Sequence, residues 1–419
     1  MHAFAPRSAL AGPARITFVA ALLLFVATIV VGILNGIDVW EPDHDSLIGH
    51  VHAGTLGWIT MGVSGIGFLM FSRDREVGTS EVATAYRLAW SVVGAITLYV
   101  GAFFLGDAVF DDRIQRPIVG TLLFVVVIWY LVWLLGAHRA HAQASAGRLG
   151  FVLAWISLIV GAAFGVILGL YIANGEVPLL SDDTAAAVAE AHPPAMVIGF
   201  LLLAAFAVIE WMLHERWSRA GAAQMWLLFV AGLVINIAFV TGLDQELAGP
   251  ANLLMIVAGV MLLWRSREQL APSGWRGVGA GVFPRMALVF LVVYLVLLTI
   301  LVSWIVTETI DFDAVTDAQM GLILSFDHVM FIGVMTNVLF GTLAVNLPPD
   351  RTVTANRILI WGVNVGIAGF AVGLIAVEAV IKRIFTPILG VALLVGIWVY
   401  FQELVRARAL DAVEESVPG

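Results

Sequence analysis

The sequence predicts an all-α, polytopic membrane bundle of about twelve transmembrane helices. Apolar residues make up 61% of the 419 residues and charged residues only 12%, whereas roughly a quarter of an average soluble domain is charged. The mean hydropathy is +0.99. Apolar runs of about 20 residues, long enough to cross a hydrocarbon core, recur along the whole chain. We therefore expect residues 1–419 to form a single integral membrane domain embedded in a lipid bilayer.

The predicted helices follow one another with short polar loops between them. Their apolar runs start near residues 16, 47, 84, 116, 149, 186, 223, 248, 282, 318, 356 and 385. The first run follows Arg7 and Arg15, is of spanning length and has no small-residue cleavage site after it. It is therefore expected to be the first helix and not a secretory signal.

Loop charges predict the orientation of the bundle. The even-numbered loops carry arginines such as Arg73, Arg139 and Arg351, whereas the odd-numbered loops carry most of the aspartate and glutamate. Lysine and arginine collect on the cytoplasmic side of membrane proteins. Both termini are thus predicted to be cytoplasmic, in a bacterial-type inner or plasma membrane.

The composition also excludes several kinds of site. The chain has no cysteine, which rules out disulfides, iron–sulfur clusters, thiolate-bound haem and covalently attached haem. The net charge is −9 and no basic patch is present, so nucleic acid is not an expected partner.

Histidine occurs in three of the predicted helices, and these are the second, sixth and tenth. The second carries His50 and His52, the sixth His192 and the tenth His328. Histidine is costly inside a bilayer, and a metal or haem iron is its expected partner there. The period of four helices predicts three four-helix units, 1–145, 146–275 and 276–419, in a pseudo-threefold arrangement.

The spacing of His50 and His52 predicts two sites. Residues i and i+2 of a helix lie about 200° apart, so the two side chains point to opposite faces. We predict that His52 pairs with His328 as the ligands of a six-coordinate haem b. His50 and His192 would then flank a second haem or a copper. His192 has an alternative interpretation as a packing residue that bonds to carbonyls freed by the two prolines after it.

The run from Gly49 to Trp58, Gly-His-Val-His-Ala-Gly-Thr-Leu-Gly-Trp, resembles the haem-ligating helix of the catalytic subunit of cbb3-type haem–copper oxidases. The resemblance implies that His50 binds a high-spin haem and His52 a low-spin haem. In that family the motif lies on the tenth helix, and here it lies on the second. The chain is also similar to NnrS-type membrane haem proteins, which carry His-x-His on an early helix.

Other features of the oxidases are missing. The seventh predicted helix lacks the histidine pair that binds copper in that family, and neither it nor the sixth contains a tyrosine. A complete proton-pumping oxidase is therefore not expected.

Two odd-numbered loops carry basic residues against the charge rule: Arg113 and Arg116 in one, Lys382 and Arg383 in the other. Haem propionates are anionic and are normally held by arginine or lysine. These four residues are accordingly predicted propionate partners. The alternative is that they are interfacial anchors, or that they pair with Asp112 or Glu378.

These observations predict a b-type haem protein with one or two haems, and copper as a further possibility. It would bind or reduce a diatomic gas such as nitric oxide or oxygen, with a cytochrome or another subunit as electron donor. Two alternatives remain. One is an electron carrier with only six-coordinate haem, and the other is a 12-helix transporter whose histidines bind protons or a metal.

Overall fold

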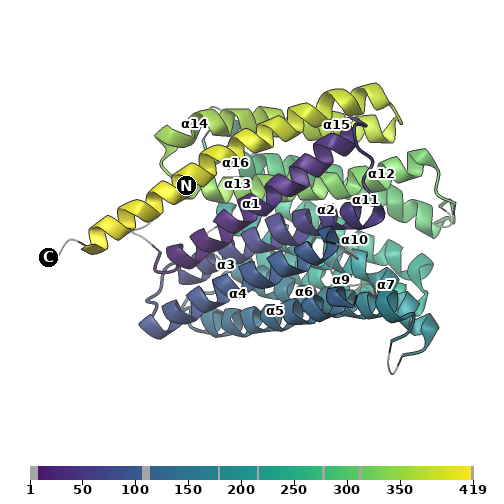
Figure 1. The fold of residues 1–419 in the computed structure, drawn as a ribbon, viewed down its shortest axis with the longest axis horizontal. Coiled ribbons are helices and arrows are strands. Elements are labelled where there is room, and N and C mark those ends of the chain that lie inside the picture. Colours follow the sequence, from purple (N-terminus) through teal and green to yellow (C-terminus); the bar gives the residue numbers. More distant parts are fainter. Residues whose placement is uncertain are drawn as a thin grey trace.

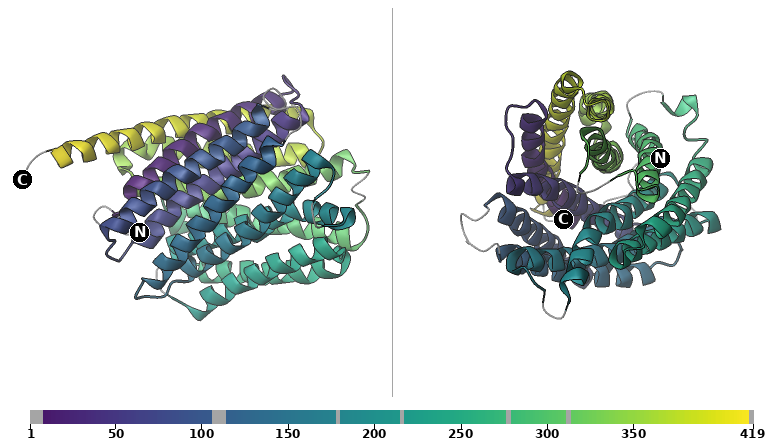
Figure 2. Two further views of the ribbon diagram at one scale, coloured as in Figure 1. Left: turned by 60° about the horizontal axis from the view of Figure 1, so that its bottom comes forward. Right: turned by 90° about the vertical axis from the view of Figure 1, so that its right-hand side faces the viewer.

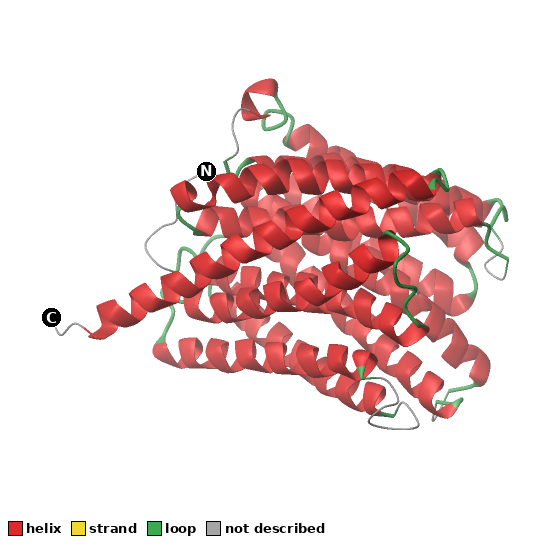
Figure 3. Cartoon of the chain, turned by 45° about the horizontal axis from the view of Figure 1, so that its top comes forward, coloured by secondary structure: helices red, strands yellow, loops and turns green. Residues whose placement is uncertain are grey.

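The computed structural model describes residues 8–105, 114–177, 180–214, 217–275, 279–310 and 314–416. Within these ranges the chain consists of helices joined by loops, and no strand is present (Figure 3). Twelve helical spans are long and apolar enough to cross a membrane. The predicted all-α fold with twelve membrane-spanning helices is confirmed.

Eight of the spans are single α-helices. These are α1 (Ala11–Gly36), α4 (Thr79–Phe104), α5 (Gln115–Arg139), α6 (Ala146–Asn174), α9 (Arg219–Thr241), α10 (Asp244–Arg265), α11 (Val282–Val306) and α16 (Ala379–Ser416). The helix α1 begins, and α16 ends, at the same end of the bundle (Figure 1).

The other four spans each contain a π-helical segment. They are α2 (His44–His52), η1 (Ala53–Thr60) and α3 (Met61–Ser72); α7 (Asp182–Pro194), η3 (Ala195–Leu202) and α8 (Leu203–Leu213); α12 (Asp317–His328), η5 (Val329–Thr336) and α13 (Asn337–Asn346); and α14 (Pro349–Ile358), η6 (Leu359–Val363) and α15 (Asn364–Ile375).

The three histidine-bearing spans are the central ones. The apolar windows of the second, sixth and tenth spans are 94%, 67% and 78% buried, and no other span exceeds 50%. The remaining helices surround them (Figure 2). The outer helices pack side by side in order from α1 through α4, α5, α6, α9 and α10 to α11, and α16 packs against both α15 and α1, whereas α11 meets the eleventh span at η6.

Side-chain caps fix where each central span begins. The Asp43 carboxylate accepts from the Ser46 N–H at 2.7 Å, and the Ser181 hydroxyl accepts from the Thr184 N–H at 3.3 Å. Thr316 forms a capping box with Gln319. Caps of this kind satisfy the free N–H groups of a first helical turn. The caps therefore fix the residue at which each central span begins, and with it how far along the span each histidine lies.

The same order of helix types, which we call the backbone frame, recurs in all three central spans. Each changes from α- to π-helix for eight residues, at η1, η3 and η5. His52 and His328 come directly before η1 and η5, whereas His50 and His192 lie three residues before η1 and η3. π-Helical turns are rare and are frequently found at functional sites. This repetition is what a pseudo-threefold arrangement requires, while the division of the chain into four-helix units stays a prediction.

Candidate cofactor-binding cavity

A cavity of about 820 Å³ lies among the central helices, and all four intramembrane histidines line it. Its walls come from α1, α2, α4 to α7, η1, η3, α12, η5, α15 and α16. Among the described residues, none that lines the cavity belongs to α9, α10 or α11. The cavity therefore lies on both sides of the second span, between α1 and α15–α16 on one side and α4 to α7 on the other.

Each of the four histidines is held through Nδ1 by a backbone carbonyl. The acceptors are Thr28 O for His50 at 3.0 Å, Ile48 O for His52 at 2.9 Å, Gly161 O for His192 at 2.8 Å and Leu324 O for His328 at 2.7 Å. Because a carbonyl oxygen can only accept, Nδ1 must carry the proton in each case. This tautomer leaves the lone pair of Nε2 free, as in histidines that ligate metals.

We call each of these Nδ1 hydrogen bonds the anchor of its histidine, and the four anchors follow one rule. His52 and His328, directly before their π-helical segments, bond to a carbonyl of their own helix four residues earlier. His50 and His192, three residues before theirs, bond to the preceding outer helix, α1 or α6. The two kinds of anchor therefore occur once each on either side of the second span.

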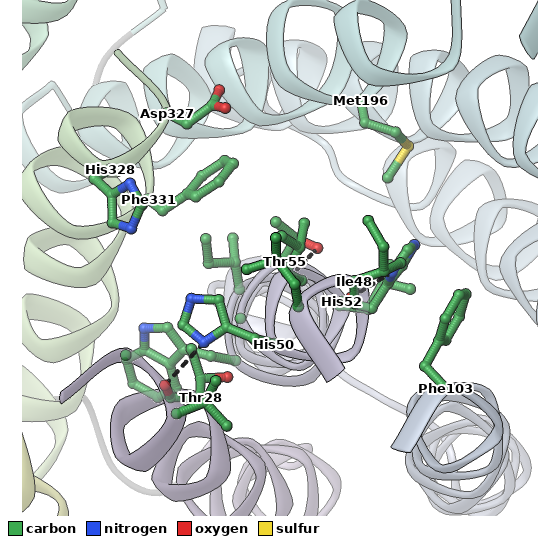
Figure 4. A pocket seen from close by; sticks show the side chains of 18 of the residues that line it. Thr28, Ile48, His50, His52, Thr55, Phe103, Met196, Asp327, His328 and Phe331 are labelled. Atoms are coloured by element: carbon green, nitrogen blue, oxygen red, sulfur yellow. Dashed lines mark hydrogen bonds between the residues drawn. The ribbon is translucent and has the colours of Figure 1, made fainter. Parts of the chain in front are cut away.

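The structure groups the histidines into two pairs. His50 faces α12, which carries His328 (Figure 4). His52 faces the opposite way, toward Phe103 and Met196 (Figure 4). Met196 lies four residues after His192 on the sixth span. We call the His50–His328 pair site A and the His52–His192 pair site B.

These pairs differ from one expectation and match another. The two-sidedness that the spacing of His50 and His52 predicts is present. The arrangement differs from the predicted pairing of His52 with His328 and of His50 with His192, because His50 faces the tenth span; which histidines bind one cofactor stays a prediction. The i, i+2 geometry defines two opposite faces, but it carries no information on which neighbour each face meets.

Each site offers two histidines and not more. In the part of the chain that the structure describes, no three His, Cys, Asp or Glu side chains are grouped closely enough to hold a metal ion. A protein-bound zinc or copper ion ordinarily takes three or four ligands. An iron held by a macrocycle needs only axial ligands from the protein. The donor set of both sites fits haem better than a bare ion.

Aromatic rings surround His52 in site B. Its imidazole stacks on Phe103 with ring centroids 4.5 Å apart, and Tyr99 contacts it edge-on at 5.3 Å. The Arg116 guanidinium lies over the Phe103 ring, 4.8 Å from its centroid. In site A the imidazole of His328 contacts Phe370 in a tilted arrangement at 5.1 Å.

Arg116 lines the cavity on the side of site B and is almost fully buried. Its Nη2 lies 2.6 Å from the Asp45 carboxylate, and its side chain is 7% exposed. Its Nε is buried with no hydrogen-bond partner among the described residues. Arg116 can therefore take a further anionic partner without leaving Asp45.

The basic pair of α16 meets the end of α1. Lys382 Nζ and Arg383 Nε each lie 2.7 Å from an oxygen of Asp38. Lys382 lines the cavity, whereas Arg383 does not and its side chain is 55% exposed. The hydrogen bonds from Lys382 and then Arg383 hold the pKa of Asp38 below its usual range.

The four predicted propionate partners lie in different places. Arg116 and Lys382 reach the cavity, Arg383 stays at the surface, and Arg113 lies outside the described residues. The described cations pair with the carboxylates of Asp45 and Asp38 and not with that of Glu378, while Asp112 lies outside the described residues.

Several residues at the cavity have no signal in the sequence. Thr28 and Gly161 contribute only a carbonyl, which any residue possesses. Asp327 also lines the cavity. It is not the anchor of His328, whose Nδ1 bonds to Leu324 O, as expected for adjacent residues on a helix. Its carboxyl is identified only once the rotation of the tenth span is known.

His141 and His214 lie in loops away from the cavity and are partly buried. His141 Nε2 lies 3.2 Å from Phe71 O, and His214 Nε2 lies 3.1 Å from Ser266 Oγ. Burial lowers the pKa of His141 to about 4. Neither is near the two sites.

No family model and no curated protein matches this sequence. The resemblance to haem–copper oxidases consequently rests on the short run around His50 and His52.

Proposed function

We propose that this protein is an integral membrane haem protein that binds one haem b at site A and one at site B and transfers electrons between them. The observation that carries the proposal is the common state of the four cavity histidines. Each is fixed by an Nδ1 hydrogen bond to a carbonyl, which leaves Nε2 available, and the four form two pairs.

The likeness of the two sites supports electron transfer over gas chemistry. Both sites combine one histidine anchored on its own helix with one anchored on the preceding helix. A haem iron held between two histidines would have no free coordination position and would supply one-electron chemistry to the site. Two equal sites of this kind suit the passage of single electrons.

The position of His50 and His52 on one helix supports electron exchange between the two sites. His50 and His52 are two residues apart on one helix and face opposite sides of it. The two cofactors would therefore be separated by little more than the thickness of that helix. Electrons could enter at one site and leave at the other, supplied by a cytochrome or another donor.

The cations at the cavity wall support binding of an anionic cofactor. Arg116 is next to site B, and its buried Nε has no hydrogen-bond partner in the part of the chain that the structure describes. Lys382 lines the cavity on the side of α1 and α16, where site A lies. Each would hold a propionate by a charge-assisted hydrogen bond.

One observation favours a second candidate, binding of a diatomic gas. The Asp327 carboxyl faces the same cavity (Figure 4), and an electron carrier does not need a proton-bearing group there. If one histidine of site A is displaced by a ligand, that site becomes a gas-binding haem, as the oxidase resemblance implies.

The haem content of the purified protein tests the proposal. A haemochrome assay should show haem b at two equivalents per chain. The variant in which His50, His52, His192 and His328 are all replaced by alanine should retain none. Tight binding of zinc or copper by a haem-free protein would instead support the transporter alternative.

A further inference from the structure

Glycines lie beside the two histidines that are anchored on outer helices. His50 bonds to the carbonyl of Thr28, and Gly32 is four residues further along α1. His192 bonds to the carbonyl of Gly161, and Gly165 is four residues further along α6. The spacing from acceptor to glycine is therefore the same at both sites.

Both imidazoles lie where a side chain on that glycine would be. A Cβ atom on Gly165 would lie 2.8 Å from Cε1 and 3.1 Å from Nδ1 of His192. A Cβ atom on Gly32 would lie 3.3 Å from Cε1 of His50. The 2.8 Å distance at Gly165 is shorter than real Cβ contacts, and the 3.3 Å distance at Gly32 is tight. Each ring therefore rests against the backbone of the outer helix.

The contact of each imidazole with the glycine and its hydrogen bond to the carbonyl four residues earlier depend on each other. The carbonyl of residue i of a helix points toward residue i+4, so a ring that donates to it must pass over that residue. Only glycine leaves room for so close an approach. His52 and His328 bond to their own helices and make no such demand on a neighbour.

We propose that Gly32 and Gly165 are positioning residues, which orient the imidazoles of His50 and His192 so that Nε2 faces the cofactor. The inference rests on the proposed function for its ligand, but the contact itself is independent of any cofactor. Because the clash is worse at Gly165, site B is the more sensitive of the two.

The variant Gly165→Ala tests this most sharply, with Gly32→Ala as the milder counterpart. Loss of an interaction that orients a metal ligand weakens binding by roughly 10- to 100-fold. We expect Gly165→Ala to weaken haem binding at site B by that factor and to change the low-spin electron paramagnetic resonance signal of that site alone. Gly94→Ala is the matched control, since a Cβ there meets nothing within 4 Å.

A thermal-unfolding cycle with His192→Ala separates this inference from the haem proposal. If Gly165 accommodates the imidazole, Gly165→Ala lowers the melting temperature when His192 is present and has little effect when it is alanine. An equal loss in both backgrounds, or no loss in either, would overturn the inference. A protein without haem would refute the proposed function, yet the unfolding cycle would still decide on the glycines.

Discussion

Sites A and B have the same backbone frame but differ in how their cations are held. At site B, Arg116 is buried between Asp45 and the Phe103 ring that stacks on His52. Near site A, Lys382 and Arg383 share Asp38 at the surface, with side chains 24% and 55% exposed. The comparison shows that one ligand geometry can be placed in two electrostatic settings, a shielded one and a solvated one.

The difference matters because burial determines the strength of a charge. A buried ion is screened little by water or salt, whereas an exposed pair is screened strongly. We therefore expect site B to be insensitive to ionic strength and site A to respond to it.

The largest effect should follow removal of a ligand. His52→Ala should abolish haem binding at site B and leave site A occupied, and His50→Ala should do the reverse. Haemochrome stoichiometry with electron paramagnetic resonance distinguishes the two products. Loss of both haems from either variant, in protein that remains folded, would show that the sites are not independent pairs.

Removal of Arg116 should have the next largest effect. Arg116→Ala leaves the Asp45 carboxylate without its buried partner, and breaking a buried ion pair costs about 3 kcal/mol or more. The free energy of unfolding in detergent should fall accordingly, and site B should lose haem affinity. The double variant Arg116→Ala/Asp45→Ala removes both charges and should recover part of the stability. No recovery would mean that Arg116 acts through packing on Phe103.

Removal of Lys382 should have a smaller effect, confined to site A. The Lys382–Asp38 pair is partly exposed, and such pairs contribute about 1 kcal/mol or less. Lys382→Ala should therefore change stability little but shift the midpoint potential of the site A haem downward, because a nearby positive charge favours the reduced state. Potentiometric titration measures this, with Arg383→Ala as the exposed control. A shift of the site B haem by Lys382→Ala would reverse the assignment of the cation.

The smallest effect should be the response of Asp38 to acid. The pKa of Asp38 is held below its ordinary value of 3.8 by Lys382 and Arg383. Its contribution to stability is therefore complete above that value and is lost as the pH falls through the lower, folded-state pKa. Wild type and Asp38→Asn should differ in melting temperature at neutral pH and converge below about pH 3.8. A difference that persists unchanged in strong acid would contradict this role.

Much of the fold follows directly from the sequence. Apolar runs of spanning length give the twelve helices, and the recurrence of His50, His192 and His328 every fourth helix identifies the three central spans. The two-sidedness of His50 and His52 is a consequence of helix geometry alone.

The rest depends on packing that no local pattern encodes. The rotation of the second span decides that His50 meets His328, and that rotation results from contacts with several outer helices at once. The carbonyls of Thr28 and Gly161 are not distinguished by residue type. The π-helical segments before which the histidines lie also have no clear sequence signature, because each is an apolar run like its surroundings.

The most direct test of the account is a reduced-minus-oxidised absorption spectrum of the purified protein, recorded with and without carbon monoxide. Two sites in which both axial positions are filled by histidine should give haem b bands that carbon monoxide does not shift. A carbon monoxide shift would contradict the electron-carrier function and favour gas binding at an open site. The absence of haem bands would contradict the central claim that these four histidines are haem ligands.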